Sequence, residues 1–397
     1  MRGPHSTWGI AAALLAAGCF SVPPFQPENA VTYTESGAGG ATVAGKGFEL
    51  GFAGGDGFHF PDALRIDGTD IMGRDPAAAC FKESEIGVVI APIARVSATG
   101  GAMPVASRLV PALRGPAVVQ AKIEWENRFT CGPTTRNAGG TSTFTVFPDG
   151  RIVRHDAFDV PAGTPVSPGP CACETPQESA DGLFNVSTFW TVSRDPFTGF
   201  YLPGDDAAKP LPPPGDRIGN EPRSCLDAGA YQVAFAWPVV ENITIRGAGP
   251  LVSFGRYLDI GLTELDAYRK ENSSTLLIGR TGCEAALTRA DELRMGTAVM
   301  IDGSARMPSP RDGIYGSDGG DGQPGIPLAG NQVDIVGPAP RGFAVWLRFP
   351  GSVDAVRARR GTAKVPGYLP QQVDDRSWIV YFPEPLATGE TITIESI

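Results

Sequence analysis

The sequence predicts a mainly β protein: a large antiparallel β-sandwich body with few short helices, followed by a small C-terminal β-sandwich module. The 397 residues include 51 Gly and 37 Pro without a Gly-x-y repeat, which is typical of many turns between short strands. Short runs of alternating apolar and polar residues recur between these turns. Helical periodicity is scarce, and a composition of 42% hydrophobic and 19% charged residues can form a sizeable core.

Alternating runs predict the strands of the body. They cover residues 47–52, 118–125, 142–147, 152–158, 183–192, 231–237, 243–246, 256–262 and 298–301. Pro148-Asp149-Gly150 between two of these runs is typical of a type I turn followed by a left-handed glycine. A three-residue hairpin loop places Thr143 opposite His155, whereas a two-residue loop would move His155 to the other face. We expect the three-residue loop.

Two short helices are expected over the sheets. Residues 284–294 carry apolar side chains on one side and end just before Gly296. Residues 263–271 begin with Thr263 as a potential N-cap, and Asp266 follows three residues later.

The pattern changes after residue 306, which we take as the end of the body that begins at residue 31. Residues 307–330 are rich in Gly, Asp and Pro and predict a linker. Residues 331–397 predict a compact Ig-like β-sandwich module. Its expected strands are residues 331–336, 342–349, 353–359, 378–382 and 390–395.

The N-terminal segment has the layout of an export signal. Arg2 precedes an apolar stretch at residues 8–17 that is too short to span a bilayer, and small residues lead into Cys19. Leu15-Ala16-Ala17-Gly18-Cys19 resembles the lipobox of bacterial lipoproteins, in which the cysteine is lipidated and becomes the first mature residue. The resemblance implies a signal peptide over residues 1–18, a tether over residues 19–30 and a lipid anchor in the membrane. An ordinary cleaved signal peptide is the alternative.

The same resemblance bears on location and redox state. Phe20 is not the acidic residue associated with retention in the inner membrane, so an outer-membrane anchor is expected, with the protein facing the periplasm or the cell surface. An oxidising compartment favours disulfides among the remaining cysteines, with a zinc site as the alternative. These cysteines are Cys80, Cys131, Cys171, Cys173, Cys225 and Cys283.

Net charge excludes some partners. A formal charge of −10 argues against nucleic acid as a partner and against polybasic docking on anionic lipid. The run Arg357-Ala358-Arg359-Arg360 is a dense basic cluster, which we interpret as a strand edge guarded against pairing.

Candidate catalytic residues are few. Outside the signal segment the histidines are His59 and His155, so a histidine-dependent acid–base mechanism must use one or both. Glu124 and Asp156 are the candidate carboxylates beside them. A structural hydrogen bond is the alternative for each histidine, and a solvated strand face is the alternative for Glu124 with Glu126. Motifs for a serine nucleophile, a phosphate loop or a dinucleotide site do not occur in the sequence.

Oxygen ligands gather in the predicted linker. Asp312, Asp318 and Asp321 are weak candidates for calcium ligands, although their spacing is not that of an EF-hand. A Gly/Asp linker without metal is the alternative, and no other cofactor is expected. Scattered aromatic residues could stack on sugars or could lie in the core. They are Trp190, Tyr201, Tyr231, Trp237, Tyr257, Trp346 and Trp378.

Residues 142–156 resemble strand pairs in the β-supersandwich of carbohydrate-active proteins such as mutarotases and polysaccharide lyases. The resemblance implies a sandwich and transfers no catalytic residue. We expect a lipid-anchored cell-envelope lipoprotein that binds a glycan or a protein partner without catalysis. A carbohydrate-active enzyme of lyase or mutarotase type is one alternative, and it requires His59 and His155 to converge. A structural scaffold of an envelope complex is the other, and it requires an exposed apolar patch on the C-terminal module.

Overall fold

The computed structural model describes residues 29–55, 59–72, 86–91, 94–96, 104–131, 134–160, 164–165, 184–241, 243–248, 251–260, 264–265, 268–319 and 321–397. These residues form a mainly β protein with a short 3-10 helix, η1 (Gly37–Gly39), and an α-helix, α2 (Cys283–Met295). Within these ranges, no helix has the length and apolar character needed to cross a membrane. The predicted signal peptide, and Cys19 with it, lies outside the described residues.

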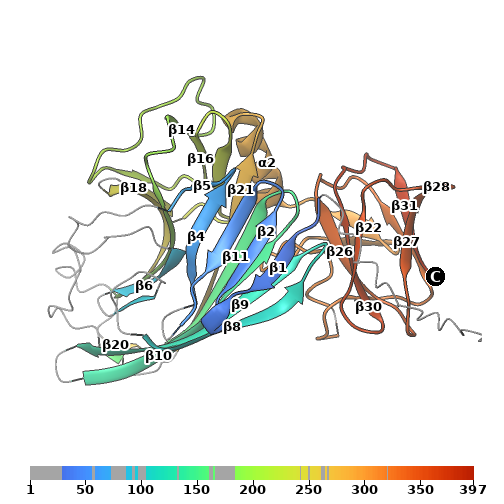
Figure 1. The fold of residues 1–397 in the computed structure, drawn as a ribbon, viewed down its shortest axis with the longest axis horizontal. Helices are drawn as coiled ribbons and strands as arrows, with labels where there is room; N and C mark the ends of the chain where they lie inside the picture. The colour runs from blue at the N-terminus through green and yellow to red at the C-terminus, as the bar shows by residue number, and fades with distance from the viewer. Residues whose placement is uncertain are drawn as a thin grey trace, which may run out of the picture.

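The body contains a small sheet and two large ones (Figure 1). The small sheet has the order β1-β2-β3-β4-β5. Its strands are β1 (Thr32–Glu35), β2 (Ala41–Gly45), β3 (Phe48–Phe52), β4 (Pro61–Ile66) and β5 (Thr69–Asp70).

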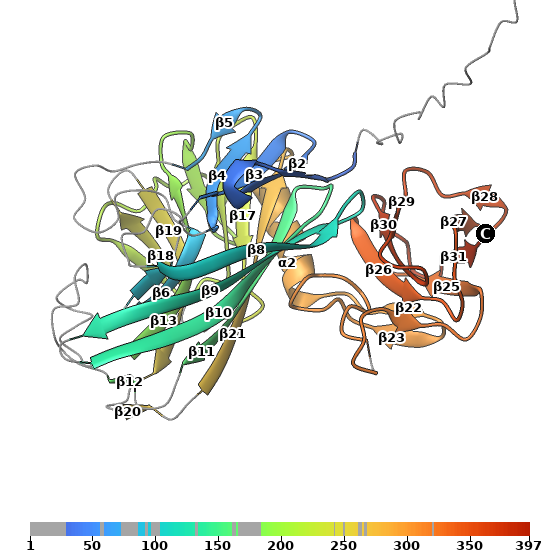
Figure 2. The ribbon, with the colours of Figure 1, turned by 60° about the horizontal axis from the view of Figure 1, so that its bottom comes forward.

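An eight-stranded antiparallel sheet has the order β14-β16-β17-β21-β11-β10-β9-β8. Figure 2 shows β8, β9, β10, β11 and β21 side by side across the body. The strands are β8 (Pro104–Arg114), β9 (Val119–Cys131), β10 (Thr134–Val146), β11 (Arg151–Val160), β14 (Gly199–Tyr201), β16 (Arg223–Asp227), β17 (Gln232–Ala236) and β21 (Tyr268–Gly279).

A six-stranded sheet, in the order β15-β18-β19-β13-β6-β7, forms the other layer of the sandwich. Its strands are β6 (Ile86–Ala91), β7 (Ala94–Val96), β13 (Phe184–Ser193), β15 (Arg217–Gly219), β18 (Ile243–Ala248) and β19 (Leu251–Ile260). A separate pair joins β12 (Thr164–Pro165) to β20 (Glu264–Leu265).

Aromatic side chains join the three main sheets of the body. The rings of Phe144 on β10 and Trp190 on β13 meet edge to face with centroids 6.1 Å apart. Phe144 also meets Phe52 on β3 edge to face, with ring centroids 5.6 Å apart. Each ring pair contributes about 0.5–1.5 kcal/mol beyond the burial of its area. The small sheet therefore belongs to the same hydrophobic core as the sandwich.

The predicted hairpin register is confirmed. Thr143 pairs with His155, and Val146 pairs with Ile152. Gly150 has a φ of 82°, and its N–H donates to the carbonyl of Phe147. This left-handed conformation favours glycine over residues with a side chain.

The helix predictions had different outcomes. The helix expected over residues 284–294 is confirmed as α2. The helix expected over residues 263–271 is wrong, because β20 and the start of β21 occupy its described residues. β21 pairs with both β11 and β17, so cross-strand hydrogen bonding outweighs the local N-cap signal.

The C-terminal module packs two sheets face to face, in the orders β23-β22-β25-β31-β27-β28 and β24-β26-β30-β29. The five strands predicted for it are present as β25, β26, β27, β30 and β31. The bounds are β22 (Val299–Ile301), β23 (Ser304–Arg306), β24 (Ile326–Pro327), β25 (Gln332–Val336), β26 (Phe343–Arg348), β27 (Val356–Arg360), β28 (Ala363–Lys364), β29 (Leu369–Gln372), β30 (Ser377–Phe382) and β31 (Thr391–Ser396).

The module begins before residue 331, where the sequence pattern placed its start. β22 pairs with β25, and Tyr315, Ile326 and Leu328 are buried in the module's core. The segment expected as a linker, residues 307–330, therefore packs into the sandwich. Its turn residues separate isolated apolar anchors, a pattern that local composition does not distinguish from a linker.

The body and the C-terminal module share a hydrophobic cluster. Its buried members are Leu113, Ala117, Val118, Phe147, Val153, Ile314, Ala344, Trp346, Leu369, Ile379 and Tyr381. Arg151 crosses the joint, because its guanidinium lies 3.7 Å from the ring centroid of Phe147 and donates to the carbonyl of Gly342 at 2.7 Å.

Gln371 on β29 supplies a second polar contact across the joint. Its Oε1 accepts hydrogen bonds from the backbone N–H groups of Ala117 and Val118 at 3.0 and 2.8 Å, and all three residues are buried. One side chain thus satisfies two donors that would otherwise be buried without a partner.

We predict that Gln371→Leu lowers the free energy of unfolding by about 2–4 kcal/mol, because two buried N–H groups lose their acceptor while the volume is nearly kept. Urea unfolding followed by fluorescence measures the change. Gln372→Leu, at an exposed position on the same strand, is the control and should change stability by less than about 0.5 kcal/mol. Equal midpoints for the two variants would contradict the prediction.

Candidate functional site

One face of the eight-stranded sheet carries hydrogen-bonding side chains in register. Lys122, Thr143, His155 and Ser273 are consecutive partners across β9, β10, β11 and β21. All four residues are partly exposed. Strands in a sheet lie about 4.8 Å apart, so this row is about 14 Å long.

A second row lies two residues further along the same face. Glu124 pairs with Thr141, Thr141 with Ala157, and Ala157 with Glu271. We call the two rows together the polar face. It consists of Lys122, Glu124, Thr141, Thr143, His155, Glu271 and Ser273.

His155 is the most constrained member of the polar face. Its Nδ1 lies 2.9 Å from the Ser273 hydroxyl, and its Nε2 lies 3.6 Å from Oε2 of Glu271. The side chain is 12% exposed. Burial lowers the pKa of His155 below its ordinary value, although the charges of Asp156 and Glu271 oppose that shift. The imidazole is therefore neutral at pH 7 and can both donate and accept a hydrogen bond.

Glu271 connects the polar face to the C-terminal module. Its carboxylate pairs with Arg269 at 3.2 Å and with Arg311 at 3.1 Å. Burial raises the pKa of Glu271, but the Arg269 hydrogen bond and the charges of Arg311 and His155 outweigh it and leave that pKa below its ordinary value. Arg311 comes from the segment expected as a linker, so the module's first loop reaches the edge of the face.

Glu124 is held as an anion. Hydrogen bonds from Arg108 and Lys122 lower the pKa of Glu124 to about 2, against a small opposing effect of burial. The Lys122 ammonium lies 2.9 Å from the carboxylate. Glu124 is two strands away from β11, so it shares the face with His155 without touching it. A carboxylate with this pKa does not donate a proton near neutral pH.

Asp156 lies on the opposite face of β11, between the two large sheets. Its carboxylate pairs with Arg154 at 2.8 Å and accepts from the Ser142 hydroxyl at 2.5 Å. All three residues are fully buried. Their contacts fit a structural role inside the core.

His59 also lies on the inner side of the eight-stranded sheet. Its Nδ1 is 2.8 Å from the carbonyl of Ala53, and its backbone N–H donates to the Ser107 hydroxyl. Ser107 pairs with Trp125, whose side chain belongs to the body's core. His59 and His155 therefore lie on opposite sides of the sheet and do not converge.

The sequence identified His155 and Glu124 on the polar face but missed Glu271, Ser273 and Arg311. Residues 269–275 of β21 are all polar, so the apolar–polar alternation that normally indicates a strand with one polar face is missing there. With no strand signal in these residues, the N-cap signal at Thr263 led to a helix prediction.

One disulfide is present among the described residues. Cys225 on β16 and Cys283 at the start of α2 are joined, with a Cα–Cα distance of 5.7 Å. The bond holds α2 against the eight-stranded sheet. Of the other candidates, Cys80, Cys171 and Cys173 lie outside the described residues, as does the side chain of Cys131 at the end of β9.

The calcium candidates have separate contacts. Oδ1 of Asp312 accepts from the N–H of Ile314 and the hydroxyl of Ser317, both at 2.9 Å. Asp321 pairs with Arg348. Within the described ranges, groups of three or more His, Cys, Asp or Glu side chains that could hold a metal ion are not found.

The aromatic residues considered for sugar stacking are mostly in the cores. Trp190 and Trp237 are each 1% exposed, and Tyr231, Trp346 and Trp378 are also buried. Tyr201 packs partly against the α2 cluster, and the side chain of Tyr257 lies outside the described residues. Ring stacking on a sugar is therefore not available from the five buried residues.

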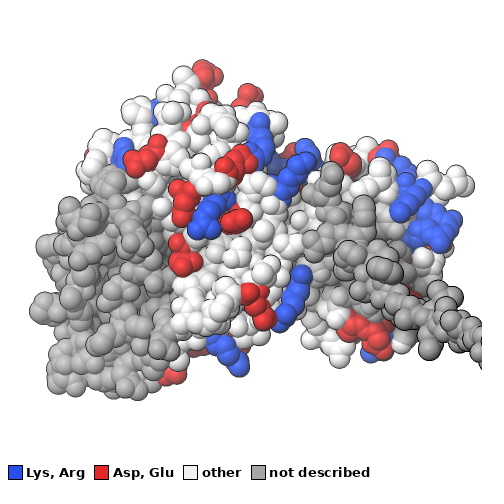
Figure 3. All heavy atoms as spheres, viewed as in Figure 1, with Lys and Arg blue, Asp and Glu red and all other residues white. Residues whose placement is uncertain are grey.

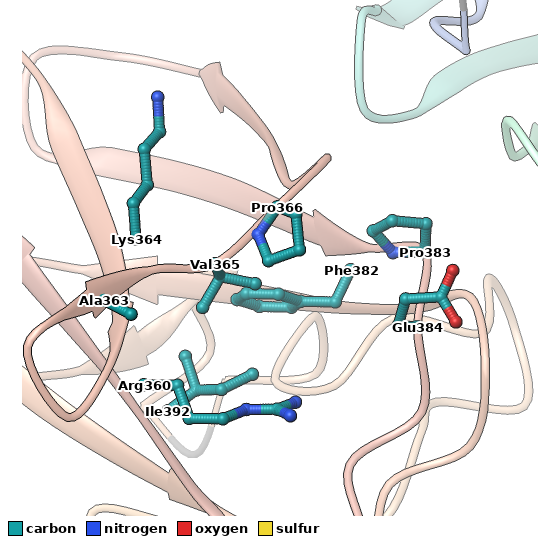
Figure 4. A pocket seen from close by; sticks show the side chains of 9 residues that line it. All are labelled: Arg360, Ala363, Lys364, Val365, Pro366, Phe382, Pro383, Glu384 and Ile392. Atoms are coloured by element: carbon teal, nitrogen blue, oxygen red, sulfur yellow. The ribbon is translucent and has the colours of Figure 1, made fainter.

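A small pocket of about 200 Å³ opens between the two sheets of the C-terminal module (Figure 4). Its lining is mostly apolar and also includes Arg360, Lys364 and Glu384. The apolar lining residues are Ala363, Val365, Pro366, Phe382, Pro383 and Ile392. Its volume suits one apolar side chain and is below the roughly 300–1,000 Å³ of typical ligand pockets.

The basic run beside this pocket is partly neutralised. Lys and Arg side chains gather over β27 and β28 (Figure 3). Arg359 pairs with Glu395 at 2.5 Å, and Arg360 pairs with Glu390 at 3.5 Å. β27 pairs with β31 on one side and β28 on the other, so the run is not itself the edge of the sheet.

Comparison with known proteins gives weak structural likeness only. No family model and no curated protein sequence matches the chain. Heparan sulfate lyase HepC from Pedobacter heparinus is similar with a TM-score of 0.35 and 8% identity, over 69% of this chain and 39% of that chain. Galactose 1-epimerase from Lactobacillus acidophilus NCFM gives a TM-score of 0.37 and 8% identity, over 64% of this chain and 98% of that chain.

A polysaccharide lyase gives a TM-score of 0.30 and 12% identity, over 87% of this chain and 45% of that chain. This chain thus spans less than half the length of both lyases. The resemblance to carbohydrate-active β-sandwich proteins is real but weak, and neither activity nor substrate follows from it.

We predict that Asp312→Asn changes the pH dependence of stability. Burial raises the pKa of Asp312 to about 7. Because this folded-state pKa lies above that of the unfolded chain, the carboxyl contributes stability that is full below about pH 4 and lost as the pH rises through 7. Asn keeps the oxygen that accepts both hydrogen bonds and does not titrate. The variant should therefore gain stability relative to the wild type between about pH 5 and pH 8.

Urea unfolding at several pH values measures this difference. Asp302→Asn, at an exposed turn in the same module, is the matched control for the loss of one negative charge. Parallel pH profiles for the wild type and the Asp312→Asn variant would contradict the prediction.

Proposed function

We propose that the protein is a lipid-anchored cell-envelope protein that binds a glycan along the polar face without cleaving it. The observation that carries the proposal is the row of Lys122, Thr143, His155 and Ser273, fixed in register across four strands. Hydroxyl groups and a neutral imidazole both donate and accept hydrogen bonds, as sugar hydroxyls do. Such a row complements a chain of hydroxyl groups better than it complements an apolar ligand.

The rigidity of the sheet supports the proposal. β9, β10, β11 and β21 are backed by the body's core, so the polar side chains are ordered before a ligand arrives. Preorganised groups lose little conformational entropy on binding. The Arg311–Glu271 pair adds a charged margin where the C-terminal module meets the face.

The absence of cleavage is supported by where the candidate residues lie. Hydrolysis of a glycosidic bond commonly uses two carboxyl groups about 5–9.5 Å apart, one of which is protonated. Glu124, with its pKa of about 2, cannot be that acid near neutral pH. Asp156 is buried on the other side of the sheet.

The envelope location is supported by the lipobox-like residues 15–19 and by the Cys225–Cys283 disulfide. Structural disulfides persist mainly in oxidising compartments. The predicted anchor on Cys19 would place the binding face at the outer membrane, on the periplasmic or the outer side.

A second candidate function is a carbohydrate-active enzyme that removes a proton from its substrate. The position of His155 between Ser273 and Glu271 favours it, because a neutral imidazole oriented by a carboxylate can act as a general base. This function uses the same face and differs from the first in forming a product.

A polysaccharide pull-down and a glycan array with the soluble form beginning at Ser21 test the proposal. We predict that Thr143→Val and Ser273→Ala each weaken binding about five- to tenfold, because each removes one hydrogen-bonding hydroxyl. Thr362→Val, at an exposed position of the C-terminal module, is the control and should bind as the wild type does.

The products decide between the two functions. Binding with an unchanged polysaccharide supports the non-catalytic proposal. A shortened, unsaturated or epimerised product supports the enzyme and rejects it. Binding that is insensitive to both substitutions on the polar face would reject both functions at this site.

A further inference from the structure

Exposed methionines cluster where the body joins the C-terminal module. Among the described residues, the large apolar side chains that are well exposed are Val240, Met295, Met300, Met307 and Ile397. The three methionines are 64%, 38% and 53% exposed, respectively, and lie within 13 residues of sequence. Methionine has a soft, polarisable thioether, so three of them together on a surface form a distinctive chemical group.

The β22–β23 hairpin places two of these methionines on one face. Met300 pairs with Ala305, and both are exposed. Met307 follows Ala305 by two residues, so it occupies the position diagonal to Met300. Diagonal neighbours on a sheet lie about 7–8 Å apart, within reach of long side chains.

The end of α2 lies beside Met307. Met295 is the last residue of α2, and Gly296 follows it with a φ of 68°. The Cε methyl of Met307 lies only 2.8 Å from the position that a Cβ on Gly296 would occupy. The thioether end of Met307 therefore rests on the backbone next to Met295.

We propose that Met295, Met300 and Met307 form a binding site for Cu(I). Thioether sulfur is a soft, uncharged ligand that selects Cu(I) over hard cations such as Mg²⁺ and Ca²⁺, which prefer oxygen. The side chains are flexible enough to turn three sulfur atoms toward one ion. The charge of Arg294, beside Met295, is paired with Asp291 at 3.0 Å and so is partly compensated.

A metal site and an apolar docking surface make different demands on these residues. Leucine nearly matches methionine in volume and apolar character but has no sulfur. Met→Leu substitution therefore removes the proposed ligands and keeps an apolar surface. The triple variant Met295→Leu, Met300→Leu, Met307→Leu isolates the contribution of sulfur.

The experiment titrates Cu(I) into the soluble form under anaerobic conditions, in competition with a chromophoric Cu(I) chelator. Free thiols are alkylated first, because thiolates bind Cu(I) more strongly than thioethers. We predict one Cu(I) per chain for the wild type and at least about a tenfold weaker affinity for the triple Leu variant. Met72→Leu, at a partly buried position of the body, is the matched control and should bind as the wild type does.

X-ray absorption on the Cu(I)-loaded wild-type protein should show sulfur as the main ligand. The expected Cu–S distance is about 2.3 Å, the length of a zinc–sulfur bond in proteins. Equal titrations of the wild type and the triple Leu variant would overturn the proposal, as would a copper shell made of nitrogen or oxygen. Urea midpoints confirm that the variant is folded. None of the three methionines belongs to the polar face, so glycan binding and Cu(I) binding can fail independently.

Discussion

The register of the β10–β11 hairpin decides what each side of this protein can do. The turn at Pro148-Asp149-Gly150 pairs Thr143 with His155. A slip of one residue would move His155 into the core and bring Asp156 to the polar face, because side chains alternate along a strand. The same turn carries Phe147 and Arg151, which contact the C-terminal module. The polar face, the body's core and the contact between the body and the C-terminal module therefore all depend on the geometry of this one turn.

Much of the β architecture could be predicted from local patterns. The hairpin was predictable because turn chemistry and strand alternation agree there. The start of β21 was mispredicted because Thr263 offers an N-cap signal, while the pairing partners that favour a strand are more than 100 residues away in sequence. The segment at residues 307–330 was mispredicted for a related reason. Its few apolar residues, such as Tyr315 and Ile326, become core residues only when β26 and β22 are already in place.

The candidate site shows the same limit. His155 stood out in the sequence because histidine is scarce, but its contacts could not be inferred from its neighbours. Ser273 and Glu271 meet it from a strand more than 100 residues later, and Arg311 reaches Glu271 from the next module. Glu124 was correctly placed on a polar strand face. Its low pKa, however, depends on a hydrogen bond from Arg108 on the neighbouring strand β8. The sequence was enough to pick out His155 and Glu124 as candidates. The contacts that set their protonation states could be seen only in the tertiary structure.

The two faces of β11 handle polar groups in opposite ways. On the inner face, Arg154 and Asp156 are fully buried and satisfy each other, since a buried charge without a partner would cost several kcal/mol. Removing one partner of such a pair costs more than replacing both, because it leaves the other charge buried and unpaired. On the outer face, the hydroxyls and the imidazole keep contact with solvent and can exchange water for a ligand. The polar groups of the inner face are paired inside the protein, whereas those of the outer face remain accessible, which is what the proposed binding requires.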